Sequence, residues 1–257
     1  MSTYALTDAT TMLRRDFHHL RRYPLMTISG IGTPTIMLLL FTFVFGGAMG
    51  SSLGSGASYV NYLVPGILLM TIGSGCAATA IGANMDMTEG VVARFRIMAI
   101  SRASVLTGRA VGSVIRTLLS VVLVIGVALL IGFRPTAGPL QWLAAFGFIV
   151  LLSLAMTWLA LAMGMAAKSV AGANSSTLLL QFGPFISSGF VPPDTMPAGV
   201  RWFAEYQPFT SMIETLRGLL LGTPLGTSPI VATAWCVVIA LGGYLWARTA
   251  YNRDPIR

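Results

Sequence analysis

Residues 60–85 read VNYLVPGILLMTIGSGCAATAIGANM, a stretch without a single charged side chain. It belongs to a longer uncharged run, residues 23–85, that lies between Arg22 and Asp86. About 20 apolar residues are enough for a helix to cross the hydrocarbon core of a bilayer. The run therefore has room for two crossings and the connection between them, and it predicts a helical membrane protein.

The overall composition supports this class. Of the 257 residues, 55% are hydrophobic and 9% are charged, and the mean hydropathy is +0.78. Soluble domains carry about 25% charged residues. The formal net charge is +8, but Lys168 is the single lysine among 16 basic residues, and most arginines flank apolar segments. A nucleic-acid-binding face needs its cations on a solvated surface, so we expect no nucleic-acid partner and a lipid bilayer instead.

Apolar runs and breaker residues divide the chain into six predicted spans. They cover residues 25–47, 60–85, 107–132, 140–167, 171–190 and 228–247. The predicted fold is an all-α polytopic membrane protein with six transmembrane helices. Residues 4–22 are amphipathic and predict an N-terminal interfacial helix. Residues 191–227 mix charges with aromatic side chains and predict an external, re-entrant helical segment.

The distribution of Lys and Arg predicts the orientation. With both termini on one side of the membrane, that side receives thirteen of the 16 basic residues. The opposite side receives Arg134, Arg201 and Arg217. Basic residues accumulate on the cytoplasmic side of membrane proteins. We therefore expect a multi-pass protein of the inner (plasma) membrane with cytoplasmic N- and C-termini.

Several kinds of chemistry have no support in the sequence. Ion-coupled carriers keep Asp, Glu, His or Lys near the bilayer midplane, and the six predicted spans contain none of these residues. A phosphate-binding loop needs Gly-Lys-Ser/Thr, whereas Lys168 follows Ala167. Cys76 and Cys236 fall inside predicted spans, where an apolar packing role is expected. We expect no catalytic residues, no metal site and no cofactor bound by this chain, which is not predicted to be an enzyme.

Residues 85–109, MDMTEGVVARFRIMAISRASVLTGR, form the longest charged interruption between spans. Thr88 can cap a helix here, and Val91, Phe95 and Met98 then fall on one helical face. A short amphipathic helix on the membrane surface offers a docking site for a cytosolic partner. An ordinary positive loop explains the arginines but not the periodicity, and both interpretations stay open at this point.

Two separated motifs carry a family resemblance. The first motif lies in the cytoplasmic stretch and consists of Glu89-Gly90, Arg94-Phe95, Ile100-Ser101-Arg102 and Gly108-Arg109. The second lies in residues 188–222 and consists of Gln207-Pro208-Phe209-Thr210 and Leu216-Arg217-Gly218. Both stretches resemble ABC-2 type permeases, particularly the daunorubicin and doxorubicin resistance permeases. One departure is Ala99, where relatives often have Pro.

The resemblance covers nearly the whole chain and implies one ABC-2 type transmembrane domain over residues 1–257, with a coupling segment at residues 86–103. It also implies a homodimer with a second permease copy and two copies of a separate ABC-type ATPase subunit, which would bind ATP and Mg. Contacts to that ATPase are expected from Glu89, Arg94, Phe95, Arg96, Met98 and Arg102.

A substrate path is implied between the two copies, lined mainly by the second and fifth spans. Asn174 and Gln181 lie seven residues apart in the fifth span, so they share a helical face and could offer hydrogen bonds. Met70, Phe182 and Phe185 are candidate contacts for a flat apolar ligand. For each of these five residues, packing between helices is the alternative role.

The implied function is export of amphipathic drugs, lipids or metabolites from the cytoplasm, powered by the separate ATPase. Two alternatives remain open at this point. One is a permease of the same architecture for a polysaccharide or another polar cargo. The other is a non-transporting membrane scaffold or an intramembrane enzyme, which would have no ATPase partner.

Overall fold

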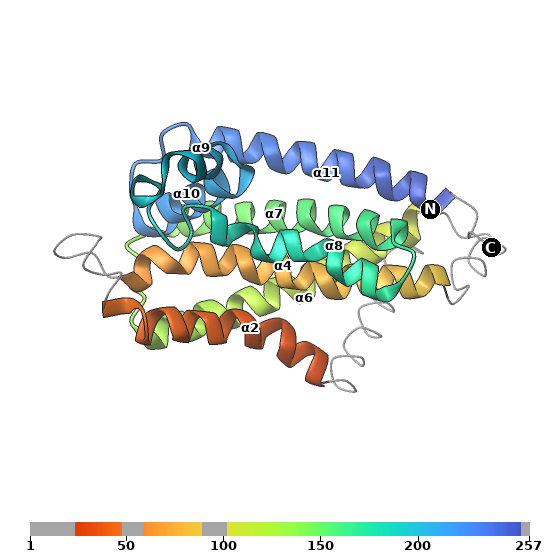
Figure 1. The fold of residues 1–257 in the computed structure, drawn as a ribbon, viewed down its shortest axis with the longest axis horizontal. Coiled ribbons are helices and arrows are strands. Elements are labelled where there is room, and N and C mark those ends of the chain that lie inside the picture. The colour runs from red at the N-terminus through yellow and green to blue at the C-terminus, as the bar shows by residue number, and fades with distance from the viewer. Residues whose placement is uncertain (1–23, 48–58, 89–101, 253–257) are drawn as a thin grey trace.

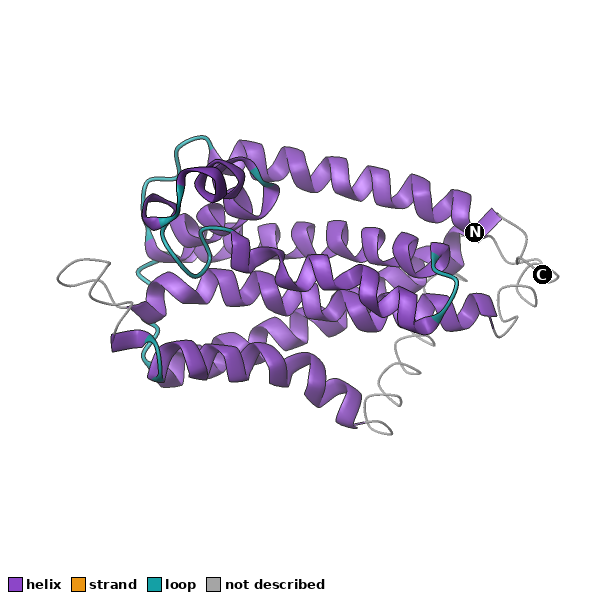
Figure 2. Ribbon diagram, viewed as in Figure 1, coloured by secondary structure: helices purple, strands orange, loops and turns teal. Residues whose placement is uncertain are grey.

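The computed structural model describes residues 24–47, 59–88 and 102–252, with side chains for residues 31–47, 59–88 and 106–251. In these ranges every regular element is helical (Figure 2). The α-helices are α2 (Pro24–Phe43), α4 (Tyr59–Thr88), α6 (Arg102–Ile131), α7 (Pro139–Ala166), α8 (Val170–Phe182), α9 (Ala198–Tyr206), α10 (Pro208–Leu221) and α11 (Ser228–Asn252). Two 3-10 turns, η2 (Gly183–Ile186) and η3 (Pro193–Thr195), lie between α8 and α9.

The long helices run roughly along one axis of the molecule, and consecutive ones point in opposite directions (Figure 1). The bundle therefore has two ends. The α9–α10 end carries the two short helices. The Lys168 end carries the last turns of α4, α7 and α11 and the first turn of α8. This alternation matches an up-and-down path through a membrane.

Four of the described helices are long and apolar enough to cross a bilayer, and they match four of the predicted spans. They cover Tyr59–Thr88, Leu106–Ile131, Pro139–Ala166 and Ser228–Tyr251. At the first predicted span, α2 has an apolar stretch of Ile31–Phe43. At the fifth, α8 has 13 residues, about 20 Å of helix. Both predicted crossings are therefore helical at the expected place. With 20 residues α2 has about the length of a full span, whereas α8 is shorter, and the number six stays a prediction.

The fifth predicted span, residues 171–190, is broken where α8 ends. Pro184 follows Gly183 directly, and a proline ring has no N–H to donate and restricts the residue before it. The chain tightens into η2 at this point. The predicted external segment, residues 191–227, is indeed helical, with α9 of 9 residues and α10 of 14 residues. Its depth in a membrane stays a prediction.

Two predicted regions lie largely or wholly outside the described residues. The N-terminal interfacial helix, residues 4–22, is entirely outside them. Of the coupling segment, residues 86–103, the structure describes only the end of α4 and the start of α6. The extent of the domain, residues 1–257, likewise stays a prediction.

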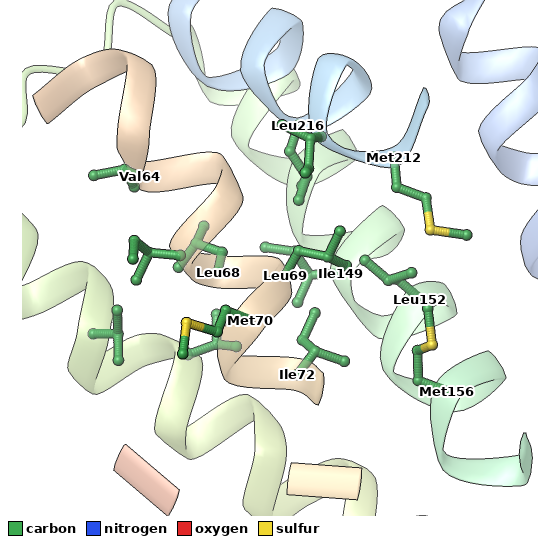
Figure 3. Close-up of a cluster of buried hydrophobic side chains, with 14 of the residues drawn as sticks. Val64, Leu68, Leu69, Met70, Ile72, Ile149, Leu152, Met156, Met212 and Leu216 are labelled. Carbon is green, nitrogen blue, oxygen red and sulfur yellow. The ribbon is translucent and has the colours of Figure 1, made fainter. Parts of the chain in front are cut away.

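The core of the bundle is built around α4. Its most apolar window is 78% buried, against 22% for α11, because α2, α6, α7, α8 and α10 all pack on α4. Figure 3 shows this packing, in which Leu68 and Leu69 of α4 lie among Ile149 of α7 and Met212 and Leu216 of α10.

Small residues allow the helices of this core to approach closely. A side-chain carbon added at Gly73 of α4 would lie 2.9 Å from the Cα of Gln181 on α8. One added at Gly164 of α7 would lie 2.7 Å from the Cα of Ala80 on α4. In lipid, helices associate through such close packing, since the surrounding tails are as apolar as the helices themselves.

Candidate functional site

The predicted ATPase contacts are not covered by the structure. Glu89, Arg94, Phe95, Arg96 and Met98 lie outside the described residues, and Arg102 begins α6 with only its backbone described. The contact set therefore stays a prediction. The structure does describe the helix ends on either side of this segment, because α4 ends at Thr88 and α6 begins at Arg102. We call these two helix ends the base of the segment.

At this base, α4 and α6 are joined by polar side chains. The Asp86 carboxylate of α4 forms an ion pair with the Arg109 guanidinium of α6. About two turns earlier in α4 and one turn later in α6, the hydroxyls of Thr79 and Ser113 share a hydrogen bond, and both residues are buried. The two helices that flank residues 89–101 are thus tied to each other at the Lys168 end.

Asn84 ties the same end of α4 to α7. Its side chain is fully buried, and its amide nitrogen donates to the carbonyl oxygens of Gly164 at 3.1 Å and Ala167 at 2.6 Å. These carbonyls belong to the last turn of α7, where four backbone acceptors lack partners within the helix. Asn84 therefore supplies two of the missing donors and holds α4 to α7, while Asp86 and Thr79 hold α4 to α6. Its position in the second predicted span gave no signal of this role.

The predicted substrate-path residues do not converge on one site. Asn174 is exposed and Gln181 is half-buried on α8. Met70 is 0% exposed and lies in the core around α4, as Figure 3 shows. In this conformation Met70 therefore has the packing role that was its alternative. Asn174 and Gln181 remain candidates for an open face of α8.

Phe182 and Phe185 belong to an aromatic cluster that includes residues not predicted from the sequence. The ring of Phe185 stacks on that of Phe190 with centroids 4.3 Å apart and 6° between planes. Phe182 lies 5.8 Å from Phe185, and Phe41 of α2 lies 4.9 Å from Phe190. The cluster joins α2 to the end of α8, and Phe182 keeps 47% of its surface exposed.

The α9–α10 end carries charges that are paired with each other. Arg201 of α9 contacts Glu205 at 2.7 Å and Asp194 at 2.8 Å. The hydrogen bond that Arg201 donates to Glu205, together with the negative charges of Glu205 and Asp194, raises the pKa of Arg201 above its ordinary value. Arg201 is therefore a charged partner for both acids at this end of the bundle.

The remaining groups of chemical interest in the described part of the chain are possible metal ligands, the two cysteines and Arg116. No group of three or more His, Cys, Asp or Glu side chains that could hold a metal ion occurs there. Cys76 and Cys236 are both buried free thiols. Arg116 lies half-buried in the middle of α6.

Four long apolar helices that run in alternating directions define an integral membrane protein. The chain belongs to the ABC-2 type transporter family, whose model matches residues 7–221.

Relatives with assigned names support the same family. The chain is 26% identical over 220 residues to "Daunorubicin resistance ABC transporter permease protein DrrB1" of Streptomyces coeruleorubidus, covering 85% of this chain and 77% of the relative. It is 27% identical over 183 residues to "Probable doxorubicin resistance ABC transporter permease protein DrrC" of Mycobacterium tuberculosis, covering 70% and 66%. It is 25% identical over 222 residues to "Putative transport permease ycf38" of Cyanophora paradoxa, covering 85% and 76%. The resemblance inferred from the two sequence motifs is therefore confirmed.

Proposed function

We propose that this chain is the membrane-spanning permease subunit of an ATP-binding-cassette exporter. It moves amphipathic drugs, lipids or metabolites out of the cytoplasm, and a separate ATPase subunit, present in two copies, binds ATP and Mg and supplies the energy. A second copy of the chain completes the pore as a homodimer in the inner (plasma) membrane. Membership of the ABC-2 type family and the names of the drug-resistance relatives support this role.

The observation that carries the proposal is the joined base of the charged segment. Asp86 and Arg109 link α4 to α6 on either side of residues 89–101, and Asn84 links α4 to α7. A force applied by an ATPase to this segment therefore reaches three helices together. In this proposal the Lys168 end faces the cytoplasm, and the segment's Glu89, Arg94, Phe95, Arg96, Met98 and Arg102 contact the ATPase.

The experiment is reconstitution of the chain in proteoliposomes with the ABC-type ATPase encoded beside it. We expect ATP hydrolysis that rises severalfold when amphipathic drugs or lipids are added, together with drug accumulation on the exit side. If an oligosaccharide raised ATP hydrolysis and drugs did not, the cargo would instead be a polysaccharide or another polar molecule. The absence of any co-purifying ATPase would contradict the exporter role.

The docking role of the segment has its own test. We expect the charge reversals Arg94→Glu and Arg102→Glu together to reduce ATPase co-purification and drug-stimulated hydrolysis at least tenfold. The same reversal at Arg248, an exposed residue of α11 near the same end, is the matched control and should have less than a twofold effect. Unchanged co-purification in the double variant would overturn the assigned contacts.

The exposed face of α8 is the proposed cargo surface. Asn174 is exposed, and Phe182 lies two turns further along at the edge of the aromatic cluster. The Asn174 amide can bond to a polar group of the cargo, and the Phe182 ring can pack on a flat apolar body. Most ligand sites combine apolar walls with a few polar groups in this way. Changes at these two positions should therefore shift the preference among cargos more than the basal hydrolysis.

A further inference from the structure

A buried cation joins three segments at the α9–α10 end. Arg217 of α10 is only 8% exposed. Its guanidinium donates to the carbonyl oxygens of Tyr62 at 3.1 Å and Ser188 at 2.8 Å, and it bonds to the Glu214 carboxylate on the same helix. Its Cζ lies 3.8 Å from the centroid of the Tyr62 ring. We call Tyr62, Ser188, Glu214 and Arg217 the Arg217 cluster.

The cluster fixes the chain that continues from α8. Ser188 follows η2, and its carbonyl oxygen also accepts a hydrogen bond from the Tyr62 hydroxyl at 2.7 Å. The neighbouring Phe190 carbonyl accepts from the Tyr59 hydroxyl at 3.2 Å. Through these bonds the end of α8 is held to the start of α4 and to α10. Any movement of α8 away from α4 at this end must break the bonds to Ser188.

Small residues also bring α4 close to α8 and to the chain that follows it. Gly73 lies against the backbone of Leu180 and Gln181, and Gly66 lies against Gly189. Such contacts are dispersion contacts, each of them weak. The hydrogen bonds from Tyr59, Tyr62 and Arg217 add directional contacts that hold the chain after α8 to α4 and α10.

The arrangement of charge in the cluster favours reversible opening. A buried cation is costly without a counter-ion, but the counter-ion here is three residues away on the same helix. Because Glu214 moves with Arg217, the ion pair survives when α10 separates from α4 and Ser188. Only the bonds to two backbone carbonyls and the contact with the Tyr62 ring are lost. Glu214 is 36% exposed, so water can replace those bonds when the cluster opens.

The cluster also retains spare hydrogen-bonding capacity. The Arg217 Nε and the Ser188 Oγ are buried without a partner among the described residues. Unsatisfied buried groups lower the stability of the state that contains them. The closed arrangement is thus held by several hydrogen bonds but is not saturated.

We propose that the Arg217 cluster closes the cargo route at the α9–α10 end, and that breaking the bonds from Arg217 and Tyr62 to Ser188 opens it. This role assumes the export function proposed above, whereas the bonds themselves can be tested without it. In this role Arg217 holds the route closed through its bonds to the protein and does not contact cargo.

The test measures how fast a thiol at position 188 reacts with a membrane-impermeant maleimide in the full chain, held in lipid nanodiscs. Ser188→Cys is introduced after Cys76→Ala and Cys236→Ala. Ser188 is 0% exposed, and its Oγ makes no bond within the described residues, so the substitution preserves the cluster. We expect slow labelling in this parent, at least tenfold faster labelling with Arg217→Met, and an intermediate rate with Arg217→Lys.

The matched control is Arg201→Met. Arg201 lies at the same end and is paired with acids, but it is exposed and belongs to α9. We expect this change to alter the labelling rate less than twofold. Equal acceleration by Arg201→Met and Arg217→Met would overturn the inference, since loss of charge alone would then explain the effect. An unchanged rate in Arg217→Met would overturn it as well.

Global unfolding is monitored separately with the native Cys76, which is 2% exposed in the centre of the bundle. If Arg217→Met also exposes Cys76, the milder Tyr62→Phe decides the question, since it removes only the hydroxyl that bonds to Ser188. Severalfold faster labelling at position 188, with Cys76 still protected, would support the gate, and no acceleration would overturn it. Neither ATPase nor cargo is present, so failure here leaves the export function standing.

Discussion

At Gly164 of α7, the hydrogen atom that replaces a side chain is what allows α7 to lie against the backbone of α4. An added Cβ would fall 2.7 Å from the Cα and 2.8 Å from the carbonyl carbon of Ala80. Both neighbours are backbone atoms that cannot rotate away. At this residue the interhelical distance is therefore set by a single missing methyl group, close to the hydrogen bond that Asn84 donates to the Gly164 carbonyl.

Gly164→Ala should destabilise the chain, because overpacking a tight core costs about 1–3 kcal/mol. For a chain of this size that amounts to several degrees in the thermal midpoint, at about 2–4 °C per kcal/mol. The measurement is the temperature at which the full-length protein in detergent loses its monodisperse size-exclusion peak. Gly147→Ala is the control on the same helix, since no atom lies within 4 Å of its added Cβ. Equal midpoints for the two variants would contradict the packing argument.

Among the elements, α4 is the central helix of the bundle, and side chains of its last turns are bonded to α6 and α7. Asp86 and Arg109 form a half-buried ion pair between α4 and α6, with side chains 28% and 31% exposed. Fully exposed ion pairs contribute about 0.2–1 kcal/mol to stability, and the contribution of this half-buried pair is expected to be modest as well. Its main effect is to fix the relative position of the two helices that flank residues 89–101.

Asp86→Asn and Arg109→Gln should each weaken drug-stimulated ATP hydrolysis severalfold in the reconstituted complex, and the double variant should be no worse than either single variant. Residues that act through one shared contact are non-additive in this way. ATPase co-purification should be retained, since the changes lie at the base of the docking segment. Arg248→Gln, at the same end on α11, is expected to behave like the parent. Fully additive losses would show that the two side chains act separately.

For the whole molecule, the two ends differ in charge. Near the Lys168 end, the described side chains include Arg109, Lys168 and Arg248 with one acid, Asp86. At the α9–α10 end, three arginines (Arg134, Arg201 and Arg217) are equalled in number by three acids (Asp194, Glu205 and Glu214), and Arg201 and Arg217 pair with theirs directly. A surplus of positive charge favours the cytoplasmic side. On this rule the Lys168 end would face the cytoplasm, and the orientation stays a prediction.

Two single-cysteine variants test this orientation in intact cells, in a chain where Cys76 and Cys236 are replaced by alanine. Lys168→Cys and Thr223→Cys are both exposed connections at opposite ends of the bundle. We expect an impermeant maleimide added outside to label Thr223→Cys rapidly and Lys168→Cys only after permeabilisation. The reverse order would place the Lys168 end outside and remove the basis for ATPase docking there.

The class of this protein was determined by its sequence alone, for a simple physical reason. In lipid, the backbone must satisfy its own hydrogen bonds, so long uncharged runs have to be helices, and the helices α4, α6, α7 and α11 lie where those runs predicted them. The two motifs around residues 89–109 and 188–222 identified the family, which the match over residues 7–221 confirmed.

Only the tertiary structure decided which of these residues meet. Asn84 caps the last turn of α7, Met70 is buried in the core, and Arg217 joins Tyr62 to Ser188. The sequence gives little sign of such contacts, because the protein core and the surrounding lipid are both apolar, and hydrophobic periodicity does not distinguish the helical face that packs on protein from the one that faces lipid. That choice depends on how each helix is rotated and how closely small residues such as Gly73 and Gly164 let it approach its neighbour.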